Sequence, residues 1–420
     1  MHHFQYKNDI LYCEDVAVSE IVSRVGSPCY IYSSATLKRH FRAFDEGFAG
    51  IGHLTCFAVK SCSNIAILNL FAGLGGGADI VSGGELFRAL KAGVPGNRIL
   101  YSGVGKSRRE MREALSAGIL MFNVESTQEL DRLNETARSM NMTAPVAFRV
   151  NPDVDPETHA YISTGLAKNK FGIGVDEALG EYERAAAMSH IDVIGVSCHI
   201  GSQLTKLDPF LETLRKLKNF IARLAERNII IRHLDLGGGV GITYRDEEPP
   251  HPRDYARAIL QELGDTDITL FLEPGRVLVG NGGILVTEVQ YTKLNTGGDQ
   301  HKRFIIVDAA MNDITRPSMY GAYHAILPVR RTDGDEHVVD IVGPICESGD
   351  FLAKDRMFPE VRQGDLLAVM SAGAYGFTMA SNYNSRPRTP EILVDGENFT
   401  VIRERETYED LIRGEHIPAS

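Results

Sequence analysis

Long apolar runs, clusters of basic residues and paired cysteines are all missing from this sequence of 420 residues. No apolar stretch approaches the ~20 residues that a membrane-spanning helix needs, so we expect no membrane partner. No run of Lys and Arg occurs and the net charge is −11, which argues against a nucleic acid as partner. The first residues, MHHFQYKNDILYCEDV, contain no basic segment followed by an apolar one, so we expect no signal peptide.

The cysteines are few and are spaced neither like a disulfide framework nor like a zinc site. They lie at positions 13, 29, 56, 62, 198 and 346. Unpaired thiols are typical of the cytosol. We therefore expect a cytoplasmic protein without a bound metal.

Short β-branched or apolar runs alternate with helical segments between residues 56 and 276. The runs cover residues 56–60, 78–82, 99–103, 120–124, 146–150, 194–201, 233–239 and 270–276. Ser107 is a natural N-cap and Gly118 a natural stop for one helix, while Ser126 followed by Glu129 fits a capping box for the next. Eight strands that alternate with helices predict an α/β fold, a TIM-type (β/α)₈ barrel. An open doubly wound sheet is the alternative that this pattern leaves open.

After about residue 285 the pattern changes to strands joined by short turns, which predicts an antiparallel β-sandwich or small β-barrel domain. These runs cover residues 284–294, 303–309, 324–330, 337–343, 365–372, 391–396 and 399–404. The N-terminal segment ILYCEDVAV also resembles a strand. We therefore expect residues 1–30 to join the C-terminal β-domain, residues 31–284 to form the barrel, and residues 285–420 to form the β-domain.

Polar side chains follow the predicted strands at the end of the barrel where chemistry takes place. Lys60 closes the first strand, and burying an ammonium group is costly unless it is paired or neutralised. A lysine in this position can form a Schiff base, whereas the alternative is a lysine whose head group reaches solvent. His199 closes the sixth strand; a lone histidine beside an apolar run is more often a core residue, so its role depends on its neighbours.

Glycines follow the last two strands, where barrels commonly bind phosphate. They are the run 237–239 and Gly275, which precedes Arg276. Glycine lets backbone N–H groups approach phosphate oxygens, although a tight turn explains the glycines equally well. A Schiff-base lysine with a phosphate cradle implies pyridoxal 5′-phosphate (PLP). Glu273 would then hold a proton on the pyridine nitrogen, and His199 would lie against the ring face.

Longer motifs resemble one family along nearly the whole chain. FAVKSCSN, HIGSQ, LDLGGGVGITY, EPGR, RPSMY, GPICESGDFL and GAYGFTMASNYNSRPRTPEILV together resemble the diaminopimelate decarboxylases, which are barrel-type PLP enzymes related to ornithine decarboxylase and alanine racemase. One departure is Ser61, where the family often has alanine after the lysine. The resemblance implies decarboxylation of meso-2,6-diaminopimelate at its D centre to L-lysine and CO₂, the last step of lysine biosynthesis. It also implies a homodimer with shared active sites.

The resemblance further implies a role for each matching residue. The implied catalytic residues are Lys60, His199, Glu273 and Cys346. The implied cofactor-binding residues are Lys60, His199, Ser202, Gly238, Gly239, Glu273, Gly275, Arg276 and Tyr375. The implied substrate-binding residues are Arg276, Arg316, Tyr320, Glu347 and Tyr375. Cys346 and Glu347 would enter the partner subunit's site, where Cys346 is a candidate proton donor and Glu347 would bind the ammonium of the distal centre.

Other roles remain open for some of these residues. Arg316 and Tyr320 could form a surface hydrogen-bonded pair, Cys346 could be a buried inert thiol, and Tyr375 could be a core tyrosine. The long polar segment 151–173 is either a lid over the site or a solvated insertion.

Two competing functions also remain open. One is a decarboxylase of the same fold that acts on ornithine, arginine, lysine or a carboxylated polyamine; the other is a non-catalytic barrel that binds PLP. The CESGD motif and the two arginines favour a substrate with a second amino-acid head group.

Overall fold

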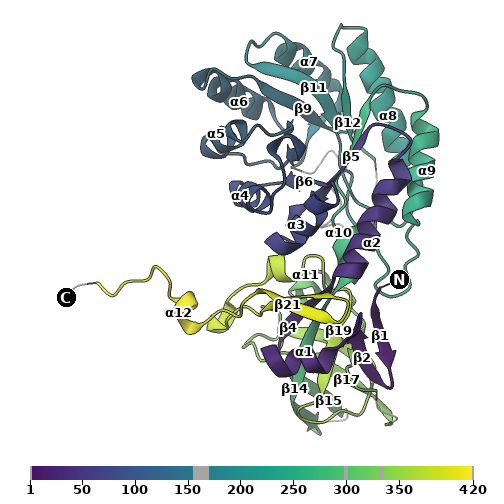
Figure 1. The fold of residues 1–420 in the computed structure, drawn as a ribbon, viewed down its shortest axis with the longest axis vertical. Helices are drawn as coiled ribbons and strands as arrows, with labels where there is room; N and C mark the ends of the chain where they lie inside the picture. The colour runs from purple at the N-terminus through teal and green to yellow at the C-terminus, as the bar shows by residue number, and fades with distance from the viewer. Residues whose placement is uncertain (1, 155–169, 298–300, 332–333, 419–420) are drawn as a thin grey trace. The chain divides into compact units, whose positions relative to one another are not determined.

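The computed structural model describes residues 2–154, 170–297, 301–331 and 334–418, which form two compact units (Figure 1). The barrel unit comprises Lys38–Thr243 and Glu247–Leu278, and the sheet unit comprises Met1–Leu37, Tyr244–Asp246 and Val279–Ser420. The main divisions between the compact units follow Leu37 and Leu278, whereas the sequence predicted domain boundaries after residues 30 and 284. The sequence did not predict that the three residues Tyr244–Asp246, which follow Thr243 of the barrel unit, belong to the sheet unit.

Parallel strands close into a barrel in the barrel unit. Among the described residues these are β5 (His53–Ala58), β6 (Gly77–Ile80), β7 (Ile99–Tyr101), β8 (Met121–Val124), β9 (Ala144–Asn151), β11 (Ile191–Ser197), β12 (His233–Asp235) and β13 (Thr269–Leu272). A short strand, β10 (Ile173–Gly174), adds to β9. The last barrel strand pairs with the first, with Leu270 opposite His53. This pairing confirms the predicted closed barrel and excludes the open sheet.

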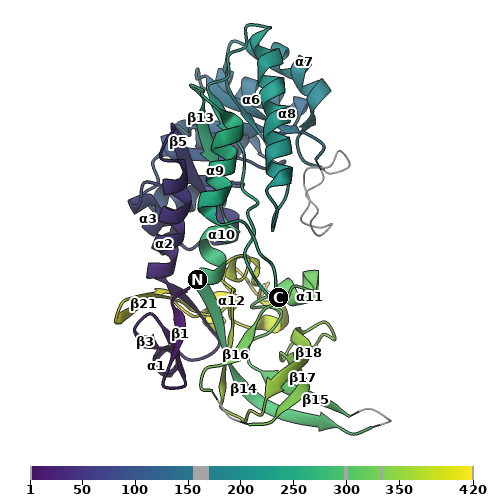
Figure 2. The ribbon, with the colours of Figure 1, turned by 90° about the vertical axis from the view of Figure 1, so that its right-hand side faces the viewer.

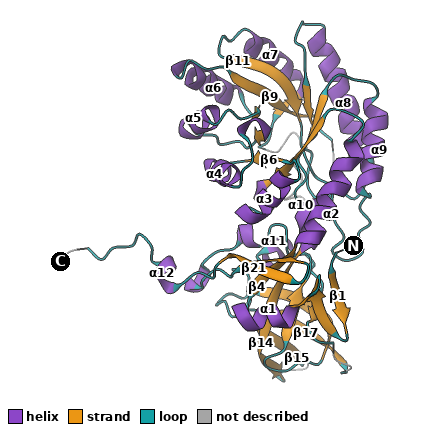
Figure 3. Ribbon diagram, viewed as in Figure 1, coloured by secondary structure: helices purple, strands orange, loops and turns teal. Residues whose placement is uncertain are grey.

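Helices surround these strands (Figures 2 and 3). They are α2 (Ser34–Asp45), α3 (Ile65–Gly73), α4 (Gly83–Lys91), α5 (Arg108–Ser116), α6 (Thr127–Ser139), α7 (Val175–Ala186), α8 (Asp208–Ala225), α9 (Pro252–Leu263) and α10 (Arg276–Val279). Ser107 caps α5 in a capping box with Glu110. The box predicted for α6 is incomplete: Ser126 accepts from the backbone N–H of Glu129, but the Glu129 carboxylate accepts from the Glu125 N–H and from Lys106 instead.

Side chains fill the barrel interior in layers. One layer is apolar and contains Cys56, Leu100, Met121, Ala147, Ile194 and Phe271. Two residues further along several of these strands, the alternation of side chains brings polar groups to the interior. These buried polar residues are Asp79, Ser102, Asn123, Ser197, Asp235 and Glu273. The polar layer therefore lies at the carboxyl ends of the strands, where barrel enzymes carry out chemistry.

The sheet unit is built around a large mixed sheet (Figure 3). Among the described residues its strands are β4 (Cys29–Ser33), β14 (Gly283–Asn295), β15 (Lys302–Val307), β16 (Ile326–Pro328), β17 (Glu336–Val342), β18 (Phe351–Pro359), β19 (Leu366–Val369), β20 (Glu391–Asp395) and β21 (Asn398–Arg403). Most of its strand pairs are antiparallel, as predicted, but the sheet is mixed because β15 pairs parallel with β17 and β4 pairs parallel with β20. In both places the partners are distant in sequence, so no hairpin turn joins them.

The N-terminal segment forms a small sheet of its own within the sheet unit. Among the described residues it contains β1 (Phe4–Lys7), β2 (Ile10–Cys13) and β3 (Val16–Ala17), followed by the helix α1 (Val18–Val25). A bridge between Ile10 and Arg330 connects this sheet to the rest of the unit. Two short helices, α11 (Arg316–Tyr320) and α12 (Tyr408–Leu411), complete the unit. No helix in the described part of the chain has the length and hydropathy needed to cross a bilayer.

Candidate active site

Lys60 lies one turn beyond the first barrel strand rather than at its last residue. It occupies the 3₁₀ turn Val59–Ser61, and its Nζ donates to Oδ2 of Asp79 at 2.9 Å. The Asp79 side chain is fully buried, whereas the Lys60 side chain is 34% exposed. A buried carboxylate therefore holds the amine at the mouth of the barrel, where the amine can still be reached from outside. Ser61 closes the turn by donating to the Ala58 carbonyl at 2.7 Å.

Glu273 directly follows β13 and belongs to a buried hydrogen-bonded network. Ser102 Oγ donates to its Oε1 at 3.2 Å, and Asn123 Nδ2 donates to Ser102 Oγ at 3.0 Å. The same amide donates to Oδ2 of Asp235 at 2.8 Å. The network fixes the Glu273 carboxyl at the carboxyl end of the barrel.

The environment of Glu273 favours its protonated form. Burial, together with the charges of Asp235 and Asp79, raises its pKa well above the ordinary value of 4.5, while Lys60 acts in the opposite direction. Burial also raises the pKa of Asp235. A cationic ring nitrogen beside Glu273 would favour its carboxylate, because an opposite charge stabilises the ionised form.

His199 follows β11 and is held as a neutral ring. The backbone N–H of Gly238 donates to Nδ1 of His199 at 3.1 Å, so the proton of the neutral ring lies on Nε2. Burial and the nearby cations Arg149 and Lys60 lower the pKa of His199 well below 6.5. Arg149 also donates to the His199 backbone carbonyl at 3.3 Å. A neutral, fixed imidazole suits the predicted stacking role better than general acid catalysis.

Two glycines that follow β12, Gly238 and Gly239, stand where no side chain fits. A Cβ at Gly238 would lie 2.1 Å from the Glu273 carbonyl oxygen, and one at Gly239 would lie 2.6 Å from the Gly201 carbonyl oxygen. Gly239 also has a φ of 111°, which side chains rarely allow. Nη2 of Arg276, which follows Gly275, donates to Ser202 Oγ at 3.0 Å and so ties the loop after β13 to the loop after β11. Backbone without side chains, next to a cation, suits a phosphate group.

The sheet unit places its own predicted residues in a second cluster. Ser318 of α11 donates to the Gly349 carbonyl at 2.6 Å, which ties this helix to the CESGD turn. Within that turn, the backbone N–H of Cys346 donates to Oδ1 of Asn384 at 2.8 Å. Among the described residues, which include all six cysteines, only Cys346 is exposed. Glu347 beside it is exposed as well.

Arg316 and Tyr375, which also belong to the sheet unit, are less exposed than Cys346 and Glu347. Arg316 is 6% exposed, and its Nε donates to Nε2 of the buried His324 at 3.3 Å. Tyr375 is half-buried and has a φ of 55°, next to Gly376, where a Cβ would lie 2.4 Å from the Ala372 carbonyl oxygen. Tyr320, at the end of α11, is half-buried. The predicted site residues therefore fall into two sets, one in each unit.

Sequence reasoning missed the polar residues that support the predicted ones. Asp79, Asn123 and Asp235 lie within strands whose other residues are mostly apolar, and they were read only as parts of those strands. A polar side chain at an inward position of a buried strand is the signal that would have found them. The central part of the predicted lid, residues 155–169, lies outside the described residues.

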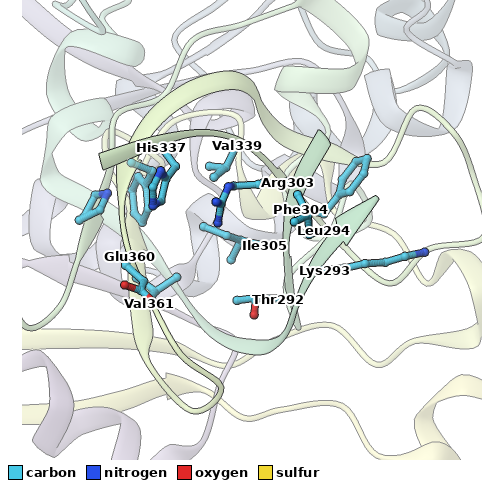
Figure 4. A pocket seen from close by; sticks show the side chains of 12 residues that line it. Thr292, Lys293, Leu294, Arg303, Phe304, Ile305, His337, Val339, Glu360 and Val361 are labelled. Carbon is cyan, nitrogen blue, oxygen red and sulfur yellow. The ribbon is translucent and has the colours of Figure 1, made fainter. Parts of the chain in front are cut away.

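A cavity of about 250 Å³ on the sheet unit contains none of the predicted residues (Figure 4). Side chains of β14, β15, β17 and β18 line it, among them Arg303 and His337. It is separate from both clusters of predicted residues.

Comparison with known proteins identifies the family. The model of the pyridoxal-binding domain of pyridoxal-dependent decarboxylases matches residues 34–280. The diaminopimelate decarboxylase of Pseudomonas aeruginosa is 54% identical over 417 residues, covering 99% of both chains, and that of Haemophilus influenzae is 50% identical, covering 98% of both.

Comparison with solved structures points to the same family. Diaminopimelate decarboxylase from Helicobacter pylori, complexed with L-lysine, matches with a TM-score of 0.90 and 44% identity over 94% of this chain and 98% of that chain. The enzyme from M. jannaschii, also in complex with L-lysine, matches with a TM-score of 0.94 and 39% identity over 100% and 99%. The closed barrel and the matching sequence are those of a PLP-dependent decarboxylase. Within that class, the chain belongs to the diaminopimelate decarboxylase family.

Proposed function

We propose that this chain decarboxylates meso-2,6-diaminopimelate at its D centre and releases CO₂ and L-lysine. The observation that carries this proposal is the arrangement at one end of the barrel. There the Lys60 amine on its buried carboxylate, the network around Glu273 and the glycine loops all follow the carboxyl ends of the strands. This is the arrangement that a PLP-dependent decarboxylase requires.

The barrel residues would hold and tune the cofactor. When bound, PLP supplies an electron sink for the electron pair that the departing carboxylate leaves behind. Lys60 would attach the cofactor through Nζ, and the backbone of Gly238, Gly239 and Gly275 would face its phosphate together with Ser202 and Arg276. Tyr375 of the sheet unit is the further residue that we propose for the phosphate. The neutral ring of His199 would pack against the cofactor ring. Glu273, held by Ser102, would stabilise a proton on the ring nitrogen.

The sheet-unit residues would select the substrate. Arg316 and Tyr320, with Arg276 of the barrel unit, would bind the carboxylate of the distal L centre, because a guanidinium matches a carboxylate with two parallel hydrogen bonds. Glu347 would bind the ammonium of the same centre. The substrate loses CO₂ and gains one proton at the reacting carbon, and the Sγ–H of Cys346 is the proposed donor of that proton.

The proposal includes a cytoplasmic homodimer in which Cys346 and Glu347 complete the partner's site. Exposed apolar side chains on the barrel unit support the proposal that a partner subunit covers part of this unit. Ile65, Val81 and Val104 are 41%, 37% and 43% exposed, and all three follow the carboxyl ends of barrel strands. We propose that the partner subunit covers these side chains at that end of the barrel.

The competing substrates ornithine, arginine and lysine lack the second amino-acid head group that the two arginines and Glu347 would bind. The test measures CO₂ release from meso-diaminopimelate and from each competing amino acid, together with the absorbance of bound PLP. We expect turnover of meso-diaminopimelate alone, and loss of both turnover and the bound-cofactor absorbance in Lys60→Ala.

The exposed Lys91→Ala variant is the matched control and should behave like the wild type. Faster release of CO₂ from ornithine or arginine would contradict the proposed substrate. Undiminished turnover in Lys60→Ala would contradict the proposed role of the lysine.

A further inference from the structure

His324 is a fully buried histidine whose hydrogen bonds determine where its proton lies. Its Nδ1 is 2.9 Å from the Met370 carbonyl oxygen, and its Nε2 is 3.3 Å from Nε of Arg316. A carbonyl oxygen can only accept, so Nδ1 must carry a proton. Arg316 can only donate, so Nε2 must accept. The neutral ring with its proton on Nδ1 is the form that satisfies both bonds.

Arg316 is fixed by a second aromatic side chain. Its guanidinium carbon lies 5.0 Å from the centre of the Tyr244 ring, which is 8% exposed. The Tyr244 ring meets the His324 ring edge-on at 5.3 Å and an angle of 79°. Tyr244 belongs to the three-residue excursion Tyr244–Asp246 into the sheet unit. The excursion therefore supplies one wall of the Arg316 environment.

The bond to His324 also determines how the guanidinium can meet a carboxylate. A guanidinium offers paired N–H groups along an edge that contains Nε and along the edge formed by its two terminal nitrogens. Because His324 occupies the Nε hydrogen, a carboxylate must use the terminal edge for a two-bond contact. The orientation of Arg316 thus depends on an acceptor at the Nε2 position.

We propose that His324 is a positioning residue that orients Arg316 toward the distal carboxylate of the substrate. This inference rests on the proposed role of Arg316 in binding that carboxylate. His324 would act only through Arg316, so its removal should weaken substrate binding while the chemical step is retained. Interactions of this kind raise KM with little change in kcat.

Two substitutions separate the two bonds of His324. The side chain of Asn reaches the Nδ1 position, so His324→Asn can donate to the Met370 carbonyl but provides no acceptor for Arg316. The longer Gln reaches the Nε2 position, so His324→Gln provides that acceptor and loses the bond to Met370. A residue needed only for packing would respond to both changes alike.

Two inhibitors separate carboxylate binding from the rest of the site. L-Lysine retains the carboxylate of the distal centre, whereas 1,5-diaminopentane has no carboxylate. We expect His324→Asn to raise KM for meso-diaminopimelate and the inhibition constant of L-lysine about tenfold, the size expected for a lost charged hydrogen bond. Its kcat and its inhibition by 1,5-diaminopentane should stay close to wild type, and His324→Gln should stay close to wild type in all four quantities.

Equal losses in the Asn and Gln variants, or an unchanged inhibition constant of L-lysine in His324→Asn, would overturn the inference. Arg316→Ala tests the underlying proposal separately. If that variant binds L-lysine normally, the proposed role of Arg316 fails. If it binds L-lysine weakly while His324→Asn does not, only the role of His324 fails.

Tyr244→Leu provides a second measurement should His324→Asn not fold. It removes the aromatic wall and leaves the histidine in place. We expect weaker inhibition by L-lysine and unchanged inhibition by 1,5-diaminopentane. Unchanged inhibition by both compounds in Tyr244→Leu would count against an oriented Arg316.

Discussion

The carboxyl groups at the mouth of the barrel are chemically alike but have different partners. Asp79 is paired with the Lys60 ammonium at 2.9 Å. Glu273 instead faces the charges of Asp235 and Asp79 in a buried network, which raises its pKa. The carboxylate form of Glu273 is therefore favoured only when a positively charged group, such as the pyridinium nitrogen of PLP, lies beside it. Its function depends on its charge as well as its shape.

Glu273→Gln tests this dependence on charge. Glutamine can still accept from Ser102, so we expect the cofactor to remain bound. The ring nitrogen loses an ionisable partner, and we expect kcat to fall at least about 30-fold, or about 2 kcal/mol of transition-state stabilisation. Absorbance and steady-state CO₂ release measure the two effects. The exposed Glu226→Gln variant is the control, and a kcat for Glu273→Gln within threefold of wild type would refute the role.

Asp313 in the sheet unit predicts a dependence of stability on pH. The residue is 2% exposed, and burial raises its pKa from 3.8 to about 7, although its carboxyl accepts from the Ala310 N–H at 3.0 Å. The folded protein therefore binds this proton more tightly than the unfolded chain does. Its stabilising contribution is full below pH 3.8 and is lost as the pH rises to about 7.

Asp313→Asn removes that titration. Relative to this variant, the wild type should lose up to about 4 kcal/mol of unfolding free energy between pH 4 and pH 7. Chemical denaturation at several pH values measures the difference, with the exposed Asp9→Asn as a control for the change of residue type. Parallel curves for wild type and Asp313→Asn would show that this carboxyl does not titrate in that range.

Individual elements were predictable wherever local chemistry determines them. The predicted run 56–60 overlaps β5, although Val59 and Lys60 lie in the turn beyond it, and Ser107 caps α5 as its chemistry requires. β18 was missed because Lys354, Asp355 and Arg356 interrupt its apolar pattern. The second half of the α6 capping box failed for a different reason. Glu129 binds the buried ammonium of Lys106, a tertiary partner that the local sequence does not reveal.

The capping box of α5 predicts how much a single residue at the start of a helix contributes to the unfolding free energy. Ser107 Oγ accepts from the Glu110 N–H at 3.3 Å, and Glu110 in turn accepts from the Ser107 N–H at 2.9 Å. Ser107→Ala should lower the unfolding free energy by about 1 kcal/mol, because it leaves an N–H of the first turn without its cap. The exposed Ser116→Ala, at the other end of the same helix, should change it by less than about 0.5 kcal/mol. Urea denaturation compares them, and equal effects would exclude a special role for the cap.

At the scale of the whole molecule, the barrel was more predictable than the sheet unit. The barrel joins strands that are neighbours in sequence, and only the closure from β13 to β5 spans a long separation. The sheet unit joins β4 to β14 and β20, which lie hundreds of residues away. The candidate site divides in the same way. The sequence draws attention to residues that directly follow the strands, such as Glu273. The roles of Asp79 and Asp235, which are themselves strand residues, and of His324 beside Arg316 depend on packing that the sequence does not display.

The proposed sharing of sites between two chains predicts a specific pattern of rescue. Lys60→Ala and Cys346→Ala are each expected to be inactive because each lacks one essential group. When the two variants are dissociated, mixed in equal amounts and reassociated, about half of the dimers are mixed. In a mixed dimer with shared sites, one site carries both lesions and the other carries neither. About one quarter of all sites should therefore regain activity.

A second mixture tests the same geometry in the opposite direction. A chain that carries both Lys60→Ala and Cys346→Ala is combined with wild type in equal amounts. With shared sites, every site of a mixed dimer has one lesion, so about one quarter of all sites stay active; with unshared sites about one half do. Glu347→Ala replaces Cys346→Ala if the latter keeps substantial activity. If mixed dimers form but the first mixture recovers nothing and the second keeps half its activity, each chain completes its own site.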